Sequence, residues 1–382
     1  MTNRTVTVLA AALVVLGALA LIAQYDPQPP SPGGGLLLPE LAGELDEITQ
    51  VTVMGAGSER VATLQRGEDG NWSIAEKAGY PADVEKVHHT LISLAESRIV
   101  EPKTANPDFY DRLGVEDVAS DDAGGVAVTL AGTDSQVNVI VGNTEGASQR
   151  YVRVPEQAQS FLIDRDPEVG GETTDWLAAE ILAIPGSRMA RVTVTHPDGE
   201  VVSVSKADPD QSNFDVEAMP EGRELQYASI ANVMGTVLSN LSLQDVEPLT
   251  ATDVPVTVTE WATFDGLVIT AESFERDDEP WVAFRAEYRT PAETPSQQAE
   301  LDDADPEQEA DSEGGTDDSS GGEAIDESAA EDDSPDVAGE AMELEQRLAG
   351  WRYRIASYQH DQMTRRMEDL LRDLPEDSEV EE

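Results

Sequence analysis

Hydrophobic and polar positions alternate over short stretches of this chain. After the first of these stretches, the hydrophobic residues are instead spaced as on one face of a helix. Residues 51–102 show the complete pattern. Strand side chains point to opposite faces in turn, so the alternation predicts three short strands, at residues 51–53, 60–64 and 71–74. After Pro81 and Asp83, which open a helix, the apolar positions share one helical face: Val84, Val87, Leu91 and Leu94.

The same order of features recurs about 140 residues later. Residues 191–194 repeat the pattern of 50–53, and 213–216 repeat that of 71–74, where Phe214 takes the place of Trp72. The ending Val-Glu-Pro at 100–102 returns at 246–248. Self-similarity at a nearly constant offset indicates a duplicated module. We therefore expect Trp72 and Phe214 to be packing residues at equivalent places.

Between and after these stretches the pattern predicts further hairpins and helices. Strand pairs are expected at 126–130 with 137–141, at 150–154 with 160–163, and at 254–259 with 267–271. His196-Pro197-Asp198-Gly199 is a hairpin turn sequence. Helices are expected at 172–184, in the apolar stripe from Tyr227 to Leu241, and from Met363 to Leu374.

The C-terminal third reads as a third, interrupted copy of the module. A strand at 281–288 is followed by a segment, residues 291–345, that holds 21 Asp and Glu and no Lys or Arg. Such a composition cannot bury a core and predicts disorder. Trp351 then stands before the last helix, as Trp72 stands before the first. The acidic segment would therefore occupy a hairpin tip equivalent to residues 67–70, where insertions are tolerated.

The predicted fold class is α+β, with two to three copies of an antiparallel β-meander plus a helix, and one N-terminal transmembrane helix. The predicted divisions are a transmembrane anchor or signal peptide at 1–24, a Pro/Gly-rich tether at 25–44, a first module with a hairpin extension at 45–190, the second module and the start of the third at 191–288, an acidic disordered insertion at 289–348, and the strand and helix that complete the third module at 349–382.

The N-terminus predicts export across a membrane. Residues 6–23 form an 18-residue apolar run behind Arg4. A bilayer core needs about 20 helical residues, so the run fits an anchor with its N-terminus inside. Ala18-Leu19-Ala20 also fits a signal-peptidase site, which leaves cleavage as the alternative. Either way, the bulk of the chain is expected outside the cytoplasmic (inner) membrane, in the periplasm, with membrane lipid as a partner of the anchor.

Charge and composition exclude several kinds of site. The formal net charge is −53, which repels nucleic acid and predicts no nucleic-acid partner. Cysteine is absent, which rules out disulfides and thiolate chemistry. The acidic segment lacks the D-x-[DN]-x-[DN]-G pattern of a calcium loop. Without its 21 carboxylates the chain would still have a net charge of −32, so the folded part is acidic too. An acidic surface of this kind is suited to solvation at high salt.

The candidate chemistry gives no catalytic, cofactor or metal site. The four histidines are interpreted as surface, turn or capping residues: His88, His89, His196 and His360. Gly142-Asn143-Thr144 follows a strand but lacks the Gly-Lys-[Ser/Thr] of a phosphate loop, and no G-x-S-x-G marks a serine hydrolase. Four aromatic residues could form a ligand platform but are better explained by strand packing: Trp72, Tyr151, Trp351 and Tyr353.

An ordered set of motifs resembles the domain-of-unknown-function family 4340. The motifs are Gly70-Asn71-Trp72-Ser73-Ile74, Tyr80-Pro81-Ala82-Asp83, Tyr110-Asp111-Arg112-Leu113-Gly114-Val115, Ile140-Val141-Gly142, Arg150-Tyr151-Val152-Arg153-Val154 and Gly350-Trp351-Arg352-Tyr353-Arg354-Ile355. The resemblance implies an envelope protein that is an auxiliary component of an ABC transport system related to gliding motility. It implies as partners an ABC permease, its ATPase and a second exported auxiliary protein. It supplies no catalytic residues.

The expected function is therefore a non-enzymatic, membrane-anchored extracytoplasmic auxiliary or scaffold subunit of such a transport system. The alternative is an exported solute- or glycan-binding module, which would need a concave pocket with clustered aromatic residues and a few convergent polar groups.

Overall fold

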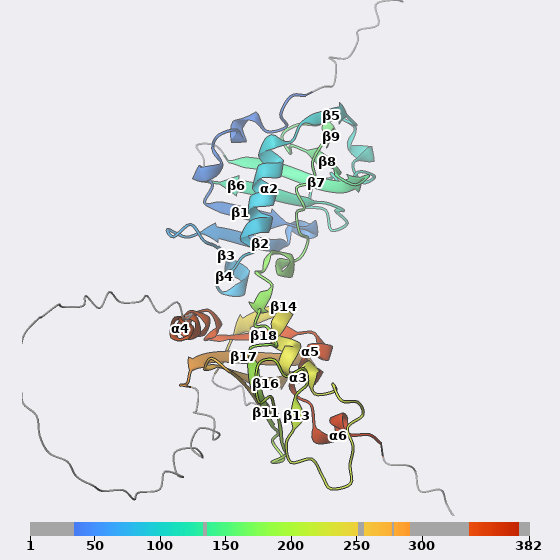
Figure 1. Ribbon diagram of the computed structural model, residues 1–382. Helices are drawn as coiled ribbons and strands as arrows, with labels where there is room; N and C mark the ends of the chain where they lie inside the picture. The colour runs from blue at the N-terminus through green and yellow to red at the C-terminus, as the bar shows by residue number, and fades with distance from the viewer. Residues whose placement is uncertain (1–33, 133–135, 251–255, 277–278, 291–335, 374–382) are drawn as a thin grey trace, which may run out of the picture. The chain divides into compact units, whose positions relative to one another are not determined.

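The computed structural model describes residues 34–132, 136–250, 256–276, 279–290 and 336–373. The chain divides into two compact units, the first ending at Ala178 and the second beginning at Ala179. Each unit is built around one nine-stranded sheet in which all strand pairs are antiparallel (Figure 1). Antiparallel sheets with a few helices confirm the α+β class. The predicted boundary at 190/191 comes too late, because residues 180–182 already pair within the second sheet.

Unit 1 combines its sheet with one α-helix among the described residues. Its strands are β1 (Gln50–Met54), β2 (Arg60–Arg66), β3 (Trp72–Ile74), β4 (Tyr80–Pro81), β5 (Ile99–Pro102), β6 (Val126–Ala131), β7 (Val137–Glu145), β8 (Gln149–Arg153) and β9 (Ser160–Ile163). Its helices are α2 (Val84–Glu96) and the 3-10 turns η1 (Pro39–Leu41), η2 (Leu45–Glu47), η3 (Ala56–Ser58), η4 (Ala75–Lys77), η5 (Pro107–Phe109) and η6 (Thr173–Trp176). The strand order is β4-β3-β2-β1-β6-β7-β8-β9-β5.

Helix α2 covers one face of the unit 1 sheet (Figure 1). It begins after Asp83, whose side chain accepts a hydrogen bond from the Lys86 amide at 3.0 Å. Val87, Leu91 and Leu94 are buried, as the helical spacing predicts, but Val84 in the first turn is 37% exposed. The helix and its core face are therefore determined by local sequence.

The other face of the unit 1 sheet carries hydroxyl side chains in register. Thr52 of β1 pairs with Thr63 of β2 and with Thr129 of β6. Val51 and Val53, the neighbours of Thr52, are buried on the opposite side. Thr52 and Thr129 are partly exposed, whereas Thr63 is buried and its hydroxyl donates to the carboxylate of Glu76 in η4 at 2.7 Å.

Unit 2 is built from its own sheet and several short helices. Its strands are β10 (Glu180–Leu182), β11 (Met189–Thr195), β12 (Val201–Ser205), β13 (Asp215–Val216), β14 (Leu241–Pro248), β15 (Thr257–Thr263), β16 (Leu267–Arg276), β17 (Glu279–Tyr288) and β18 (Trp351–Ile355). Its helices are α3 (Asn232–Thr236), η7 (Val237–Asn240), α4 (Val337–Leu348), α5 (Ser357–Met363) and α6 (Met367–Leu370). The strand order is β10-β14-β18-β17-β16-β15-β11-β12-β13.

Eight strands of each sheet have the same spatial order when the strands of each unit are ranked by their position in the chain. In unit 1 the order is β3-β2-β1-β6-β7-β8-β9-β5, and in unit 2 it is β13-β12-β11-β15-β16-β17-β18-β14. Trp72 begins β3 and Phe214 immediately precedes β13, so both lie at corresponding strands, although β4 pairs with the outer side of β3 in unit 1. Their side chains are only 2% exposed. Both are packing residues.

The expectation of a third module is wrong, because its strands belong to the second sheet. Strands β17 and β18 pair with each other through Trp281 with Arg354 and Val282 with Tyr353. Trp351 therefore lies on the counterpart of β9 and not on the counterpart of β3. The acidic segment joins two neighbouring strands at the connection that corresponds to β8–β9, and residues 67–70 are not its equivalent. An alternating pattern identifies a strand but not its partner, which explains the error.

Three predicted helices are shorter or replaced. Residues 172–184 form η6 and then β10, with Ile181 and Leu182 buried as strand residues. The stripe from Tyr227 to Leu241 is helical only over α3 and η7, and the last helix is divided into α5 and α6. Runs of apolar residues fit a buried strand as well as a helix, and only the packing decides between them.

Helix α4 corrects the predicted extent of the disordered insertion at 289–348. Residues 337–348 are helical, with Asp336 accepting a hydrogen bond from the Gly339 amide at 2.8 Å. Val337, Ala341 and Leu348 are buried. The insertion's remaining part, residues 291–335, lies outside the described residues.

The membrane anchor predicted at 1–24 also lies outside the described residues, as does the tether up to residue 33. Across the described ranges, the structure contains no helix that is both long and apolar enough to cross a bilayer.

Candidate functional site

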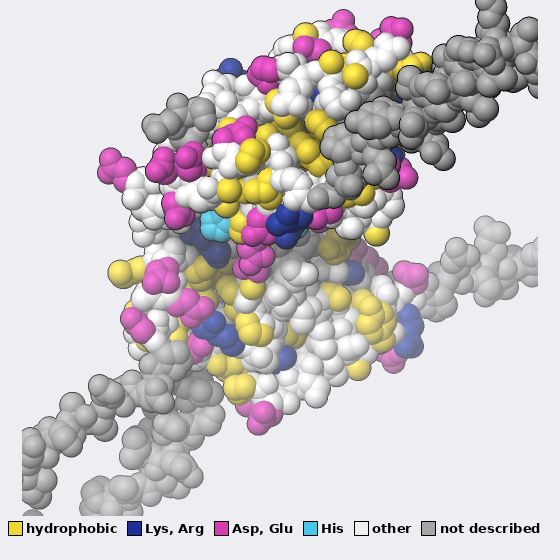
Figure 2. All heavy atoms as spheres, turned by 90° about the horizontal axis from the view of Figure 1, so that it is seen from above, with side chains coloured by type: hydrophobic (Ala, Val, Ile, Leu, Met, Phe, Trp, Pro, Cys, Tyr) yellow, Lys and Arg dark blue, Asp and Glu magenta, His cyan; other side chains and the backbone are white. Residues whose placement is uncertain are grey.

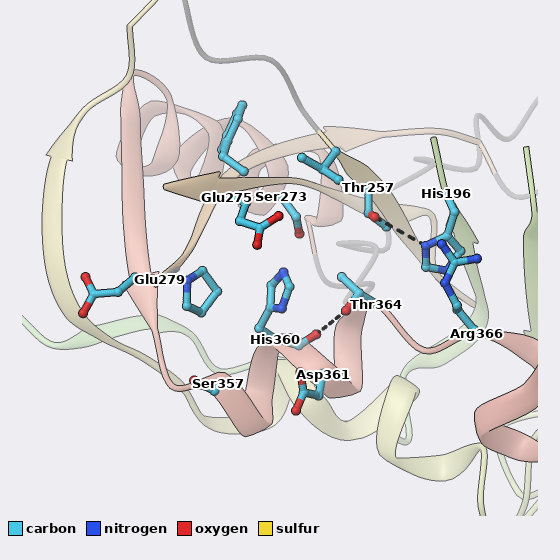
Figure 3. A pocket seen from close by; sticks show the side chains of 13 residues that line it. His196, Thr257, Ser273, Glu275, Glu279, Ser357, His360, Asp361, Thr364 and Arg366 are labelled. Carbon is cyan, nitrogen blue, oxygen red and sulfur yellow. Dashed lines mark hydrogen bonds between the residues drawn. The ribbon is translucent and has the colours of Figure 1, made fainter. Parts of the chain in front are cut away.

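A pocket of about 380 Å³ lies within unit 2, between α5 and the strands β15, β16 and β17 (Figure 3). Its lining residues come from the β11–β12 turn, β15, β16, β17, α5 and the α5–α6 connection, among them His196, Thr257, Ser273, Glu275, His360 and Arg366. Its volume falls within the range of roughly 300–1,000 Å³ that small-molecule pockets occupy. This pocket is the candidate functional site.

Strand β16 supplies a hydroxyl and a carboxylate to the pocket. Ser273 and Glu275 are two residues apart, so their side chains leave the same face of the strand, and Figure 3 shows both directed toward His360. Ser273 is 3% exposed, whereas Glu275 is exposed at the rim. Neither side chain has a protein hydrogen-bond or ion-pair partner among the described residues. Both groups are available to a bound molecule.

Helix α5 places the imidazole of His360 opposite these two groups (Figure 3). The ring is partly buried, and within the described chain it has no hydrogen-bond partner. Burial lowers the pKa of His360 below its usual range, although the carboxylates of Asp361 and Glu275 act in the opposite direction. The imidazole is therefore neutral at pH 7, with one nitrogen able to accept a hydrogen bond.

His196 and Arg366, at the other end of the pocket, already have partners. His196 is 5% exposed; its Nδ1 lies 3.4 Å from the Thr257 hydroxyl and its Nε2 3.4 Å from the Arg365 carbonyl oxygen. Arg366 donates to the carboxylates of Asp198 and Glu200 in the β11–β12 turn. Its positive charge is therefore neutralised within the protein.

The pocket consequently offers hydrogen-bond acceptors and negative charge. Glu279 also lines it and forms an ion pair with Arg354 at 2.8 Å, and Asp361 adds a further carboxylate. Within the described residues, no three His, Asp or Glu side chains are placed to hold a metal ion. The arrangement suits a ligand that carries hydrogen-bond donors.

The structure places two predicted turn or capping histidines in this pocket and leaves the other two at the surface. His196 lies at its predicted turn but is buried, and His360 lies inside α5 instead of opening it. His88 and His89 are exposed on α2, where His89 Nε2 lies 3.1 Å from the Asp166 carbonyl oxygen. The surface interpretation of His88 and His89 and the turn position of His196 are therefore confirmed, whereas His360 is not a capping residue.

The four candidate platform aromatics each pack within their own sheet. Trp72 is buried on β3, and Tyr353 is buried on β18 beside Phe284, with ring centroids 6.0 Å apart. Trp351 is partly buried on the same strand. Tyr151 packs near Tyr110 and donates its hydroxyl to Glu145 at 2.8 Å. None of the four lines the pocket.

Gly142 has a packing role that explains the resemblance to a phosphate loop. A side chain at Gly142 would lie 2.3 Å from the Leu113 carbonyl oxygen and 2.7 Å from that of Gly114. The Asn143 amide donates to the Leu113 oxygen at 2.8 Å. The backbone amide is therefore used by the segment that crosses this strand, and no anion is needed to account for the glycine.

Sequence reasoning did not find Ser273 and Glu275. They belong to an ordinary alternating strand, and nothing in their spacing distinguishes them from other strand residues. The only signals were the two histidines, which are far apart in the sequence. Their convergence depends on which strands are neighbours.

The fold and pocket define a protein of two similar antiparallel-sheet units with a small acidic pocket in the second. Residues 72–259 match the model of a protein family described as Domain of unknown function (DUF4340). The match confirms the resemblance to this family over these residues, and the motif at 350–355 lies outside them. The match begins at β3 of unit 1 and ends within β15 of unit 2, so it includes parts of both sheets. No curated protein and no solved structure matched the chain.

Proposed function

We propose that this protein is a non-enzymatic, membrane-anchored extracytoplasmic auxiliary or scaffold subunit of an ABC-type transport system related to gliding motility. The observation that carries the proposal is a partly exposed sheet face at corresponding strands of both units. In unit 1 it bears Thr52 of β1 and Thr129 of β6, which pair with each other and are partly exposed. In unit 2, Ser203 and Thr193 pair on β12 and β11, and the row continues through Glu260 to Thr270.

Such faces are suited to contact with another protein. The side chains are polar and in register across neighbouring strands, and all except Glu260 are short. Interfaces between separately stable proteins are about as polar as the rest of the surface, so hydroxyl-lined faces fit this use. The association with a permease, its ATPase and a second auxiliary protein rests on the resemblance to the family.

The anchor and the duplication belong to the same proposal. The apolar run at residues 6–23 would hold the chain in the inner membrane with its N-terminus inside and both units in the periplasm. The shared strand order of the two sheets supports descent from one duplicated module. A net charge of −53 supports the absence of a nucleic-acid partner.

Co-purification tests the scaffold proposal. After mild detergent extraction, we expect the protein to be recovered with a permease and an ATPase. Changing Thr52 and Thr129 together to Arg should reduce that recovery, because long charged side chains would separate the two surfaces. His88→Arg, at an exposed position of α2, is the matched control and should not change the recovery of the permease and the ATPase. Repeated recovery of the unaltered protein alone would contradict the proposal, and thermal unfolding checks that the double variant is folded.

The alternative function, an exported solute- or glycan-binding module, is favoured by one observation, the unit 2 pocket. Its volume of about 380 Å³ suits a small solute better than a sugar chain. A glycan site would use exposed aromatic rings, but Trp72 is buried and Trp351 is partly buried within its own sheet. Within this alternative we therefore retain only a small-solute site.

A further inference from the structure

We propose that the unit 2 pocket binds a small molecule through a protonated primary amine. The inference does not depend on the scaffold proposal, since a transport subunit and an independent module could each carry such a site. It rests on the groups that converge in the pocket, which are Ser273, Glu275 and His360.

These three groups can all accept a hydrogen bond, and none has a protein partner in the part of the chain that the structure describes. The Ser273 hydroxyl and the Glu275 carboxylate come from one face of β16, and the His360 imidazole faces them from α5 (Figure 3). Ser273 is only 3% exposed, so its hydroxyl is open chiefly to the pocket. Buried polar groups are normally hydrogen-bonded, and an ammonium group supplies three donors.

The charge of the pocket selects a cation. Glu275 and Asp361 line it with no ion-pair partner among the described residues, whereas Glu279 is paired with Arg354, and the guanidinium of Arg366 is held by Asp198 and Glu200. An anionic ligand would therefore meet carboxylates and no free positive charge. A metal ion is a poorer match than an amine, because within the described residues no three suitable ligands converge. Hydrogen bonds between an ammonium and a carboxylate are among the stronger ones in proteins.

The pocket is also large enough for the hydrocarbon part of a short amine, and part of its lining is apolar. Pro280 and Val256 line it beside the polar groups, and its volume is about 380 Å³. Short diamines and amino alcohols have the size and the polarity that these walls require.

Calorimetric titration of the full chain in mild detergent and phosphate buffer tests the site. The probes are putrescine, agmatine and ethanolamine, with 1,4-butanediol as the uncharged match of putrescine. We expect at least one amine to bind with a Kd of about 1 mM or below, and the diol not to bind. Equal binding of putrescine and butanediol, or no binding of any amine in this range, would overturn the proposal.

Two variants on β16 locate the binding. Glu275→Gln should weaken the amine about tenfold, because it replaces a charge-assisted hydrogen bond with a neutral one. Glu272→Gln is the matched control, since Glu272 leaves the opposite face of the same strand and does not line the pocket. If both variants retained the affinity of the unaltered protein, the assigned site would be wrong. Circular dichroism of both variants confirms that they are folded.

The pH dependence provides a second readout. Protonated His360 cannot accept a hydrogen bond and repels an ammonium, so affinity should fall as the pH drops from 7 to 5. Glu275, Glu279, Asp361, His196 and Arg366 are the other charged or titratable groups around the pocket. His360→Gln keeps an acceptor and should bind the amine with a flatter pH profile; an unchanged profile would contradict the role of His360.

Discussion

Single residues of one type have different roles in this protein, and their surroundings explain the differences. Gly142 is crossed by the backbone of Leu113 and Gly114, so any side chain there would collide with two carbonyl oxygens. Gly171, in the same unit, has open space where its side chain would be. His196 is buried and bonded, whereas His360 is partly buried and faces a cavity.

Replacing Gly142 with Ala should therefore destabilise the protein. The new Cβ forces the crossing segment away from the strand, which we expect to lower the free energy of unfolding by about 1–3 kcal/mol. Gly171→Ala should stay within about 0.5 kcal/mol of the unaltered protein. Both changes restrict the unfolded chain equally, so their difference reports the collision. Urea denaturation measures it, and equal midpoints would show that the crossing segment moves freely.

At the scale of elements, α4 shows how tertiary contacts stabilise a helix at the edge of an acidic segment. Arg188 makes two hydrogen bonds of 2.8 Å to Glu340, and these raise the pKa of Arg188 further, against the effect of its partial burial. Glu345 accepts from the Ala286 amide at 2.7 Å, and Arg347 donates to the Ile181 carbonyl oxygen at 2.9 Å. The helix is thus bonded to the sheet and to the β10–β11 connection at several points along its length.

Two adjacent residues test whether burial of one face holds α4 in place. Ala341 is 2% exposed and Met342 is 72% exposed. Ala341→Asp places a charge in the interface and should cost at least about 2 kcal/mol of unfolding free energy, while Met342→Asp should change it by less than about 0.5. Amide hydrogen exchange along 337–348 is the measurement. Similar exchange rates in the two variants would show that the buried face does not stabilise the helix.

At the scale of the whole molecule, negative charge is spread over the surface and is not confined to one segment. Figure 2 shows Asp and Glu side chains distributed over the visible face, with Lys and Arg among them. Of the 77 acidic residues, 21 lie in 291–345. Most of the excess charge therefore belongs to the rest of the chain, where it opposes compaction through self-repulsion.

Raising the salt concentration should consequently stabilise the protein. The Debye length falls from about 10 Å at 0.1 M to about 3 Å at 1 M, so repulsion is screened. Exposed ion pairs weaken as well, but each contributes only about 0–1 kcal/mol. We expect Tm to be higher in 1 M than in 0.1 M NaCl at pH 7. Near pH 4.1, the pI, the rise should largely disappear. A lower Tm in 1 M NaCl at pH 7 would show that ion pairs outweigh repulsion.

Local patterns predicted the features that depend on neighbouring residues in the chain. Alternation located the antiparallel pairs β6–β7, β11–β12 and β15–β16, and the spacing after Asp83 located α2. Side-chain direction in a strand or helix follows from backbone geometry alone, so these elements are encoded locally. The similarity between residues 71–74 and 213–216 was also visible, because equivalent strands keep similar burial.

The sequence by itself therefore determined the class of the fold, most strands, the first helix, the acidity and the resemblance to the family. Only the tertiary structure decided that β17 and β18 are neighbours in the second sheet, that residues 337–348 are helical and that 180–182 form a strand. It also brought Ser273, Glu275 and His360 around one pocket. The physical reason is that strand pairing, burial and convergence join residues distant in the chain, and their energies depend on partners that no local pattern specifies.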